Sequence, residues 1–345
     1  MAWLEEISQL EDLEDAVFDD SLVSLLESRA AGKEPRPLRF STPTFKEYES
    51  SELEGCGKNS FPAFSITAGA CGLNCDHCQK KILEPMIPAT DPDMLEQKVR
   101  HLVATQGLTG FLLSGGSNKK NEIPYGRYMP VVERLKTEFP ELKIAVHTAL
   151  LDEQRARGME AAGVDTVMMD VIGAQETIEQ VYKLKRPVDD FEQTLAALAS
   201  TSMEVTPHIV IGLHYGQILG ETNALDIVSR YNVNALVLVV IMPFYAKPGT
   251  FVTPETTDVG NIFAEARQRL PEQQVLLGCA RPPGMHKRVT DAYAIMAGLD
   301  GIAFPADGAV SVAHTIGRPF EQAHSCCSIK IGTQFNTQDR SRWVA

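Results

Sequence analysis

Runs of aliphatic residues alternate with amphipathic segments along most of the chain from residue 61 onward. The runs are rich in Val, Ile and Leu with little polar alternation, which is typical of parallel strands buried on both faces. Strands are predicted at 64–67, 110–114, 143–148, 166–171, 205–213, 235–242, 274–279 and 301–304. Helices are predicted between them, from apolar residues at helical spacing, at 92–106, 125–138, 152–162, 175–199 with a break at Pro187, 221–231, 257–270 and 287–298.

Eight strands alternating with helices predict an α/β fold, a (β/α)8 barrel of the TIM type. Since alternation alone does not show closure, an open doubly wound sheet is the alternative.

The two ends of the chain differ from this pattern. Residues 4–31 predict one or two short amphipathic helices, and residues 33–60 a connector containing Pro, Gly and Ser. We therefore expect a helical extension with its connector over 1–60, a barrel over 61–306, and a tail over 307–345 that closes the barrel mouth. The extension is expected to cover the bottom or the side of the barrel.

Composition narrows the class of protein. The 345 residues are 44% hydrophobic and 22% charged, as in an ordinary globular protein. A net charge of −13 argues against a broad phosphate-binding surface, and so against a nucleic-acid partner. No apolar run is long enough to span a membrane, and the acidic N-terminus lacks the basic region of a signal peptide. Seven cysteines, an odd number, favour a reducing compartment, so we expect a cytoplasmic protein.

Three cysteines with close spacing follow the first predicted strand. Cys71, Cys75 and Cys78 stand in a C-x3-C-x2-C pattern. They cannot all pair as disulfides, and a tetrahedral zinc site would need a fourth ligand nearby. A [4Fe–4S] cluster accepts three cysteines from one loop and leaves one iron open. His77 precedes the third cysteine, where its ring can lie against a cofactor. A zinc knuckle, or three unrelated core cysteines, is the alternative.

Polar residues and glycines stand where the predicted strands end, which is where barrel enzymes have their active sites. The second strand runs into Ser114, Gly115, Gly116 and Ser117, and paired glycines let a backbone approach a ligand closely. The third strand ends near His147 and the fourth at Asp170. Glu221 begins a helix, where the helix dipole alone explains an acid, so it is not included in the site.

A second group of cysteines lies late in the chain. Cys279 ends the seventh predicted strand, and Cys326 and Cys327 lie in a polar tail where burial explains them poorly. Vicinal cysteines rarely form a disulfide with each other, because the ring is strained. If the tail folds over the mouth, these three thiolates can hold a second iron–sulfur cluster, with Cys56 or the Ser328 hydroxyl as a fourth ligand.

The cysteine loop closely resembles the cluster loop of the radical S-adenosylmethionine (SAM) superfamily, C-x3-C-x-Φ-C, with His77 at the usually aromatic position Φ. The resemblance implies that Cys71, Cys75 and Cys78 are the catalytic cluster ligands. The open iron would bind the amino and carboxylate groups of SAM. Reductive cleavage of SAM would then give methionine and a 5′-deoxyadenosyl radical that abstracts hydrogen.

Over about residues 61–330 the chain resembles biotin synthase-like members of this superfamily, on the segments TAGACGLNCDHC, LLSGGSN, AVHTAL, GCARPPG and HSCCS. The resemblance implies that Asp170 meets the SAM ribose and that Arg186 reaches its carboxylate. It places the adenine on Val210 and Ile211, and the methionyl amino group on the glycine motif, where Ser117 replaces the usual acid. The implied cofactor-binding residues are His77, Ser114, Gly115, Gly116, Ser117, His147, Asp170, Arg186, Val210 and Ile211.

Within that group the chain resembles the two-protein lipoyl synthases. This implies a sulfurtransferase that inserts sulfur at C6 or C8 of a protein-bound octanoyl chain, with the second cluster as sulfur donor. The implied partners are an octanoylated lipoyl-carrier protein, a second radical SAM subunit, and an electron donor such as ferredoxin or flavodoxin. The upstream cysteine triplet of single-chain lipoyl synthases is absent here. A biotin synthase-like enzyme acting on a small molecule and a non-catalytic iron–sulfur scaffold are the alternatives.

Overall fold

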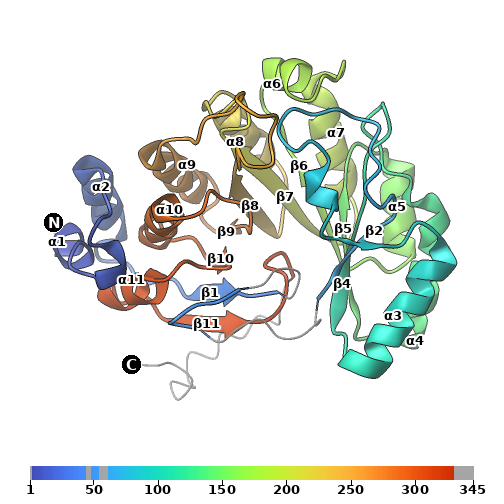
Figure 1. The fold of residues 1–345 in the computed structure, drawn as a ribbon, viewed down its shortest axis with the longest axis horizontal. Helices are drawn as coiled ribbons and strands as arrows, with labels where there is room; N and C mark the ends of the chain where they lie inside the picture. The colour runs from blue at the N-terminus through green and yellow to red at the C-terminus, as the bar shows by residue number, and fades with distance from the viewer. Residues whose placement is uncertain (1, 44–47, 54–60, 330–345) are drawn as a thin grey trace.

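A single sheet of parallel strands organises the structure, a computed structural model that describes residues 2–43, 48–53 and 61–329 (Figure 1). Within these residues it has eleven strands in the order β11-β1-β10-β9-β8-β7-β6-β5-β4-β2-β3. Their bounds are β1 (Leu38–Ser41), β2 (Ala63–Ser65), β3 (Ile87–Pro88), β4 (Gly110–Ser114), β5 (Lys143–Thr148), β6 (Thr166–Asp170), β7 (Glu204–Ile211), β8 (Ala235–Val240), β9 (Gln274–Leu277), β10 (Gly301–Ala303) and β11 (Phe320–Ala323). All eight predicted strands are confirmed.

The sheet curls into a partial barrel with β11 and β3 at its edges, which confirms the α/β barrel-type fold (Figure 1). The helices that connect its strands are α3 (Pro92–Gln106), α4 (Met129–Glu138), α5 (Glu153–Ala161), α6 (Gln175–Gln180), α7 (Val188–Ala199), α8 (Glu221–Ser229), α9 (Thr256–Arg269) and α10 (Met285–Met296).

Individual residues near the ends of α3 and α7 set where these helices begin or end. Asp91 caps α3 by accepting a hydrogen bond from the backbone of Asp93, and Gly107 ends it in the left-handed region. Pro187 stands directly before α7, since proline suits a helix start but not its interior.

The two faces of each strand have different surroundings, because side chains alternate across a sheet. In β7, Ile209 and Ile211 are fully buried in the main hydrophobic core. On the other face of the sheet, Ala145 of β5 and Met168 of β6 belong to a separate cluster in the barrel interior. The strands are parallel, so all their carboxyl ends open at one mouth of the barrel.

The N-terminal helices α1 (Ala2–Ile7) and α2 (Asp20–Ala30) pack on the side of the barrel, over α9 and α10 (Figure 1). The backbone nitrogen of Asp19 donates to the hydroxyl of Tyr293 on α10 at 2.7 Å. A Cβ on Gly260 of α9 would lie 2.7 Å from Leu22 Cδ2, so glycine permits this close helix contact. Of the two expected positions for the extension, bottom or side, the structure shows the side.

Two short strands that the sequence pattern did not predict lengthen the sheet. β1 lies within the stretch predicted as a connector, and β11 lies in the tail after α11 (Ala309–Thr315). β1 pairs with both β10 and β11, so both ends of the chain join the barrel sheet. After β11, Cys326 packs in the interior cluster of Phe61, Ala145, Met168 and Ile329, and Cys327 packs beside Val237 of β8. The tail thus enters the barrel. In the part of the chain that the structure describes, no helix is long and apolar enough to cross a membrane.

Candidate active site

The three loop cysteines lie together just beyond β2. All three are free thiols, with Cys75 buried and Cys71 and Cys78 half-buried. A hydrogen bond from Cys75 lowers the pKa of Cys78 to about 4, against the opposing effect of burial. The same bond, then burial and then the charges of Cys78 and Cys71, raise the pKa of Cys75 well above its ordinary value. Of this pair Cys78 is therefore the more acidic thiol, and Cys75 lies within electrostatic reach of both Cys71 and Cys78.

Three free thiols from one loop are the kind of donor set that holds a [4Fe–4S] cluster. Among the described residues, no three His, Cys, Asp or Glu side chains converge on one metal-ion position. Since a four-iron cluster is much larger than one ion, its three ligands need not meet at one point. His77 adds a buried ring nitrogen, Nδ1, which has no hydrogen-bond partner in the described part of the chain. Its ring packs on Tyr182, with centroids 4.7 Å apart.

Asp76, which the sequence pattern did not single out, fastens the cysteine loop to the barrel. Its buried carboxylate accepts from Lys183 Nζ at 2.6 Å. Its backbone nitrogen donates to the carbonyl of Val181 at 2.9 Å, and its carbonyl accepts from the backbone of Lys247 at 2.7 Å. The loop is therefore tied to two other segments of the barrel mouth. Asp76 and Lys183 are 107 residues apart in the sequence, so no local pattern predicts their contact.

The glycine pair after β4 packs against the cysteine loop. A Cβ on Gly116 would clash with the carbonyl oxygen of Ala70 and lie 2.7 Å from Cys71 Cα. The carbonyl of Ser117 accepts from the backbone nitrogen of Gly72 at 2.6 Å. It also lies 3.6 Å from Cys71 Sγ. Gly115 and the buried Ser114 precede this contact at the end of β4. The glycines are thus needed for the loop itself, in addition to any contact with SAM.

A cluster of ionisable side chains lies inside the barrel at the ends of β5, β6 and β7. His147 Nε2 is 3.7 Å from Asp170 Oδ1, and the rings of His147 and His208 are 5.2 Å apart. Burial would raise the pKa of Asp170, but His147, His208 and His77 hold it below its ordinary value. Burial, and then the charge of His147, lower the pKa of His208 to about 4. Asp170 is therefore ionised at neutral pH and His208 is neutral. His208 was missed because a lone histidine in a strand gives no signal of its neighbours.

The structure places the other predicted SAM-binding residues, Arg186, Val210 and Ile211, in different surroundings. Arg186 Nη1 pairs with Asp190 Oδ2 at 3.1 Å across the start of α7. Its guanidinium must exchange this partner before it can bind a carboxylate of SAM. Val210 is half-buried, whereas the Ile211 side chain is fully buried in the main core. Of these two residues, only Val210 therefore offers side-chain surface to an adenine ring.

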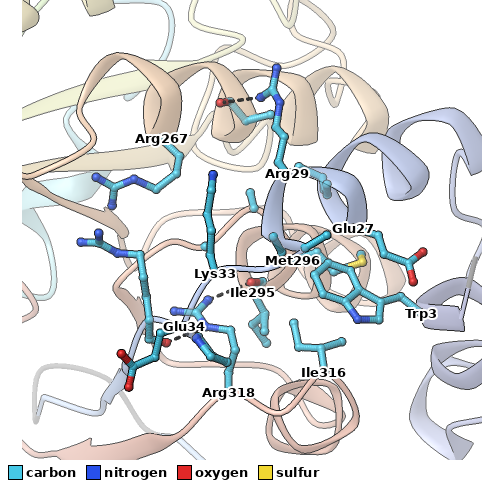
Figure 2. A pocket seen from close by; sticks show the side chains of 18 of the residues that line it. Trp3, Glu27, Arg29, Lys33, Glu34, Arg267, Ile295, Met296, Ile316 and Arg318 are labelled. Atoms are coloured by element: carbon cyan, nitrogen blue, oxygen red, sulfur yellow. Dashed lines mark hydrogen bonds between the residues drawn. The ribbon is translucent and has the colours of Figure 1, made fainter.

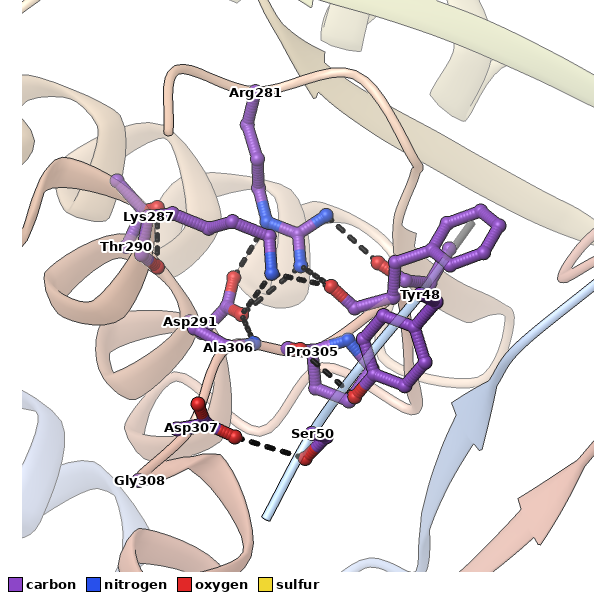
Figure 3. Close-up of polar contacts among 12 residues, drawn as sticks. Tyr48, Ser50, Arg281, Lys287, Thr290, Asp291, Pro305, Ala306, Asp307 and Gly308 are labelled. Carbon is purple, nitrogen blue, oxygen red and sulfur yellow. Dashed lines mark hydrogen bonds and ion pairs between the residues drawn. The ribbon is translucent and has the colours of Figure 1, made fainter. Parts of the chain in front are cut away.

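Cys279 follows β9 in a segment held by a buried ion pair (Figure 3). Arg281 and Asp291 are 0% and 1% exposed, with Nε and Oδ1 2.6 Å apart. Arg281 also donates to the carbonyls of Gly278, Ala303 and Phe304. With the two bonds to Asp291, all five guanidinium hydrogens are used. The ends of β9 and β10 are thereby joined to α10, which fixes the backbone on both sides of Cys279.

The tail brings Cys326 and Cys327 to Cys279. The hydrogen bond with Cys326, then burial, and then the charges of Cys326 and Cys279 raise the pKa of Cys327 well above its ordinary value. That hydrogen bond lowers the pKa of Cys326 to about 7, against the effect of burial and with help from His147. The three thiols predicted for a second cluster thus interact electrostatically. Ser328 is buried beside them, and its hydroxyl acts to lower the pKa of both Cys326 and Cys327. Cys56, the other predicted fourth ligand, lies outside the described residues.

The two cysteine groups are connected through the ionisable cluster. His77, next to Cys78, acts electrostatically on Asp170, which faces His147. His147 in turn influences Cys326. A chain of electrostatic neighbours, His77, Asp170 and His147, therefore links the two groups.

Glu221 is more than a favourable helix start. Its carboxylate is buried and accepts from the backbone nitrogens of Gly212, Leu219 and Gly220 at 2.7, 2.8 and 3.0 Å. The Glu221 carboxylate thereby joins the start and the end of the loop between β7 and α8. The sequence interpretation, a dipole effect alone, was incomplete because the loop's return to Glu221 is not visible in the local pattern.

Residues 65–219 match a family model described as the radical SAM superfamily. This stretch holds the cysteine loop, the glycine pair, Asp170 and Arg186, and it identifies a radical SAM domain within the chain. The match supports the superfamily resemblance and implies a [4Fe–4S] cluster and SAM as cofactors. No curated protein matches the chain.

Solved structures show the same fold at low sequence identity. HydG, a maturase of the [FeFe]-hydrogenase, is 12% identical with a TM-score of 0.57, over 93% of this chain and 75% of that one. Methylornithine synthase (PylB) is 12% identical with a TM-score of 0.56, over 88% and 86% of the two chains. HydG from Carboxydothermus hydrogenoformans is 17% identical with a TM-score of 0.53, over 87% and 70%. At these identities the likeness extends to the fold alone.

Proposed function

We propose that this radical SAM enzyme is a sulfurtransferase and one component of a two-protein lipoyl synthase. The observation that carries the proposal is that Cys326 and Cys279 both act electrostatically on Cys327, where the tail packs in the barrel interior. These thiols are distinct from the three of the cysteine loop, and so are available to hold a second cluster. A sulfur-inserting enzyme needs such a sulfur source within reach of its substrate.

Each residue group has a separate task in this proposal. Cys71, Cys75 and Cys78 would hold the cluster that supplies the electron for SAM cleavage. Asp170, ionised at neutral pH, would accept hydrogen bonds from the ribose hydroxyls. Arg186 would give up Asp190 for the SAM carboxylate. The tail, whose Cys326 and Cys327 pack against the interior clusters, would limit the access of water to the reacting carbon.

The proposed substrate is an octanoyl chain on a lipoyl-carrier protein, with sulfur entering at C6 or C8. A second radical SAM subunit would treat the other carbon, and ferredoxin or flavodoxin would supply electrons. These partners follow from the resemblance of the sequence segments to the two-protein lipoyl synthases.

Iron content and product analysis test the proposal. Anaerobic reconstitution of the parent protein should give about eight irons per chain, for two [4Fe–4S] clusters. The double variant Cys326→Ala/Cys327→Ala should keep about half of that iron and still cleave SAM, but transfer no sulfur to an octanoylated carrier protein. Ser325→Ala, a change at another buried side chain of the same tail, is the matched control and should retain both clusters.

The possible outcomes separate the parts of the proposal. If both the parent and the double variant hold four irons, the tail cysteines bind no cluster and are simply buried thiols. If the parent holds eight irons and abstracts hydrogen but its product contains no sulfur, the assignment as a radical SAM enzyme stands. The assignment as a sulfurtransferase is then excluded. Ser328→Ala, which removes the buried hydroxyl next to the pair, tests the fourth ligand through the loss of the second cluster alone.

A further inference from the structure

A cavity of about 880 Å³ lies on the side of the barrel, where the segment after α2 meets α9, α10 and α11 (Figure 2). Its size is within the range of small-molecule sites. It is lined by helix and loop residues on the outside of the sheet, so it is separate from the cysteine groups in the interior. The proposed function makes no use of it.

The cavity wall carries more positive than negative charge. Arg36 Nε and Arg267 Nη1 both bind the carboxylate of Asp300, at 2.7 and 2.6 Å. Arg318 is buried beside them and donates to the backbone carbonyls of Ile295 and Leu299, each at 2.8 Å. Burial, and the charges of Arg36 and Arg267 against that of Asp300, lower the pKa of Arg318 to about 10. Two guanidinium groups thus bind one carboxylate, and the third, Arg318, is held by backbone carbonyls within its electrostatic reach.

The remaining charged groups of the wall do not remove this excess. Lys33 and Arg29 add positive charge, and Glu27 and Glu34 offset them. Figure 2 shows Lys33 extending into the middle of the group, between Arg267 and Arg29. With Asp300 counted, the five cations of the wall face three carboxylates, in a chain whose net charge is −13. Such a wall is stabilised when an anion enters, because buried charges need partners.

One side of the cavity is apolar. Trp3, Met296 and Ile316 lie together there, away from Arg267 and Glu34 (Figure 2). Leu26 of α2 and Ile295 of α10 continue this surface. A ligand that fits both sides has an anionic head for the guanidinium groups and an apolar body against Trp3.

We propose that this cavity binds a small amphiphilic anion, with a phosphate or carboxylate head on an apolar body. Guanidinium groups bind both kinds of head by paired, charge-assisted hydrogen bonds. Arg36 and Arg267 present this chemistry at the cavity wall, with Lys33 as a mobile point charge. The site is a second ligand site, outside the barrel interior.

Calorimetric titration of the full chain tests this with four probes: hexyl phosphate, hexanoate, inorganic phosphate and hexanol. Hexyl phosphate or hexanoate should bind, and the tighter of the two identifies the head. Lys33→Gln should weaken that binding about three- to tenfold, and Glu34→Gln should tighten it about two- to fivefold, as expected for single charges near a surface. Both residues are exposed, so neither change should affect folding.

Arg157→Gln, which removes an exposed cation of α5 far from the cavity, is the matched control and should leave the affinity unchanged. Hexanol binding as tightly as hexyl phosphate would overturn the anion site. So would the absence of opposite effects for Lys33→Gln and Glu34→Gln, or the absence of binding by both charged amphiphiles. Inorganic phosphate binding as tightly as hexyl phosphate would overturn the role of the apolar side. None of these results depends on whether the protein transfers sulfur.

Discussion

Gly116 is in direct backbone contact with Cys71, so close that a Cβ on Gly116 would lie 2.7 Å from Cys71 Cα and would also clash with the Ala70 carbonyl. We predict that Gly116→Ala displaces the cysteine loop. The variant should take up less than half of the loop's iron on reconstitution and lose most SAM cleavage, measured as 5′-deoxyadenosine. Gly69→Ala is the matched control, since a Cβ there meets nothing within 4 Å. Full iron uptake by Gly116→Ala would show that the loop can shift without cost.

The three loop cysteines should be required for chemistry and dispensable for folding. Replacing Cys71, Cys75 and Cys78 by Ala removes the sulfur ligands, and it alters the core only where the loop packs on it, outside the strands. We expect no detectable 5′-deoxyadenosine and an unchanged circular dichroism spectrum. The Cys326→Ala/Cys327→Ala variant is the control and should still cleave SAM. Cleavage at the parent rate by the triple variant would refute the assignment of the site.

Asp170 should contribute to SAM affinity through its charge. Its interaction with His147 keeps it ionised, and a lost charge-assisted hydrogen bond costs about 1.5–3 kcal/mol. Asp170→Asn should therefore weaken SAM binding by roughly ten- to a hundredfold, measured by equilibrium dialysis of the reconstituted protein. An unchanged affinity would reduce Asp170 to a structural partner of His147.

Arg186 offers a test in two directions because it already has a partner. Arg186→Ala should weaken SAM binding by roughly ten- to a hundredfold, for the same reason as Asp170→Asn. Asp190→Ala releases the guanidinium from its 3.1 Å ion pair and should leave SAM binding equal or tighter. If both substitutions weaken binding alike, the pair serves only to hold the start of α7.

The buried pair Arg281–Asp291 should matter for stability. Arg281→Met removes the closest ionic partner of the buried Asp291, which keeps only Lys287 Nζ at 3.7 Å and the backbone nitrogen of Ala306; losing such a partner typically costs about 3–5 kcal/mol. Urea unfolding should show this loss. Arg230→Met is the control, since it breaks an exposed pair with Glu192 that is worth at most about 1 kcal/mol. Similar losses in both variants would contradict the role of burial.

The sequence by itself determined the repeating strand–helix units and the place of the cysteine loop. Aliphatic runs predicted β4 and β5 at their observed bounds, and a helical pattern predicted α3, whose ends the structure shows at the Asp91 cap and at Gly107. These elements are encoded by neighbouring residues, through periodicity, capping and the special backbone of Gly and Pro. The cysteine spacing is equally local, because three ligands of one cluster come from one loop.

Only the tertiary structure decided how distant segments meet. β1 and β11 carry no strong strand pattern, and they become strands by pairing with each other and with β10. Lys183 finds Asp76, and Cys326 and Cys327 reach Cys279, only because the barrel curls and the tail enters it. The three arginines around Asp300 come from separate parts of the chain. Such contacts depend on packing across the whole sheet, which no short stretch of sequence encodes.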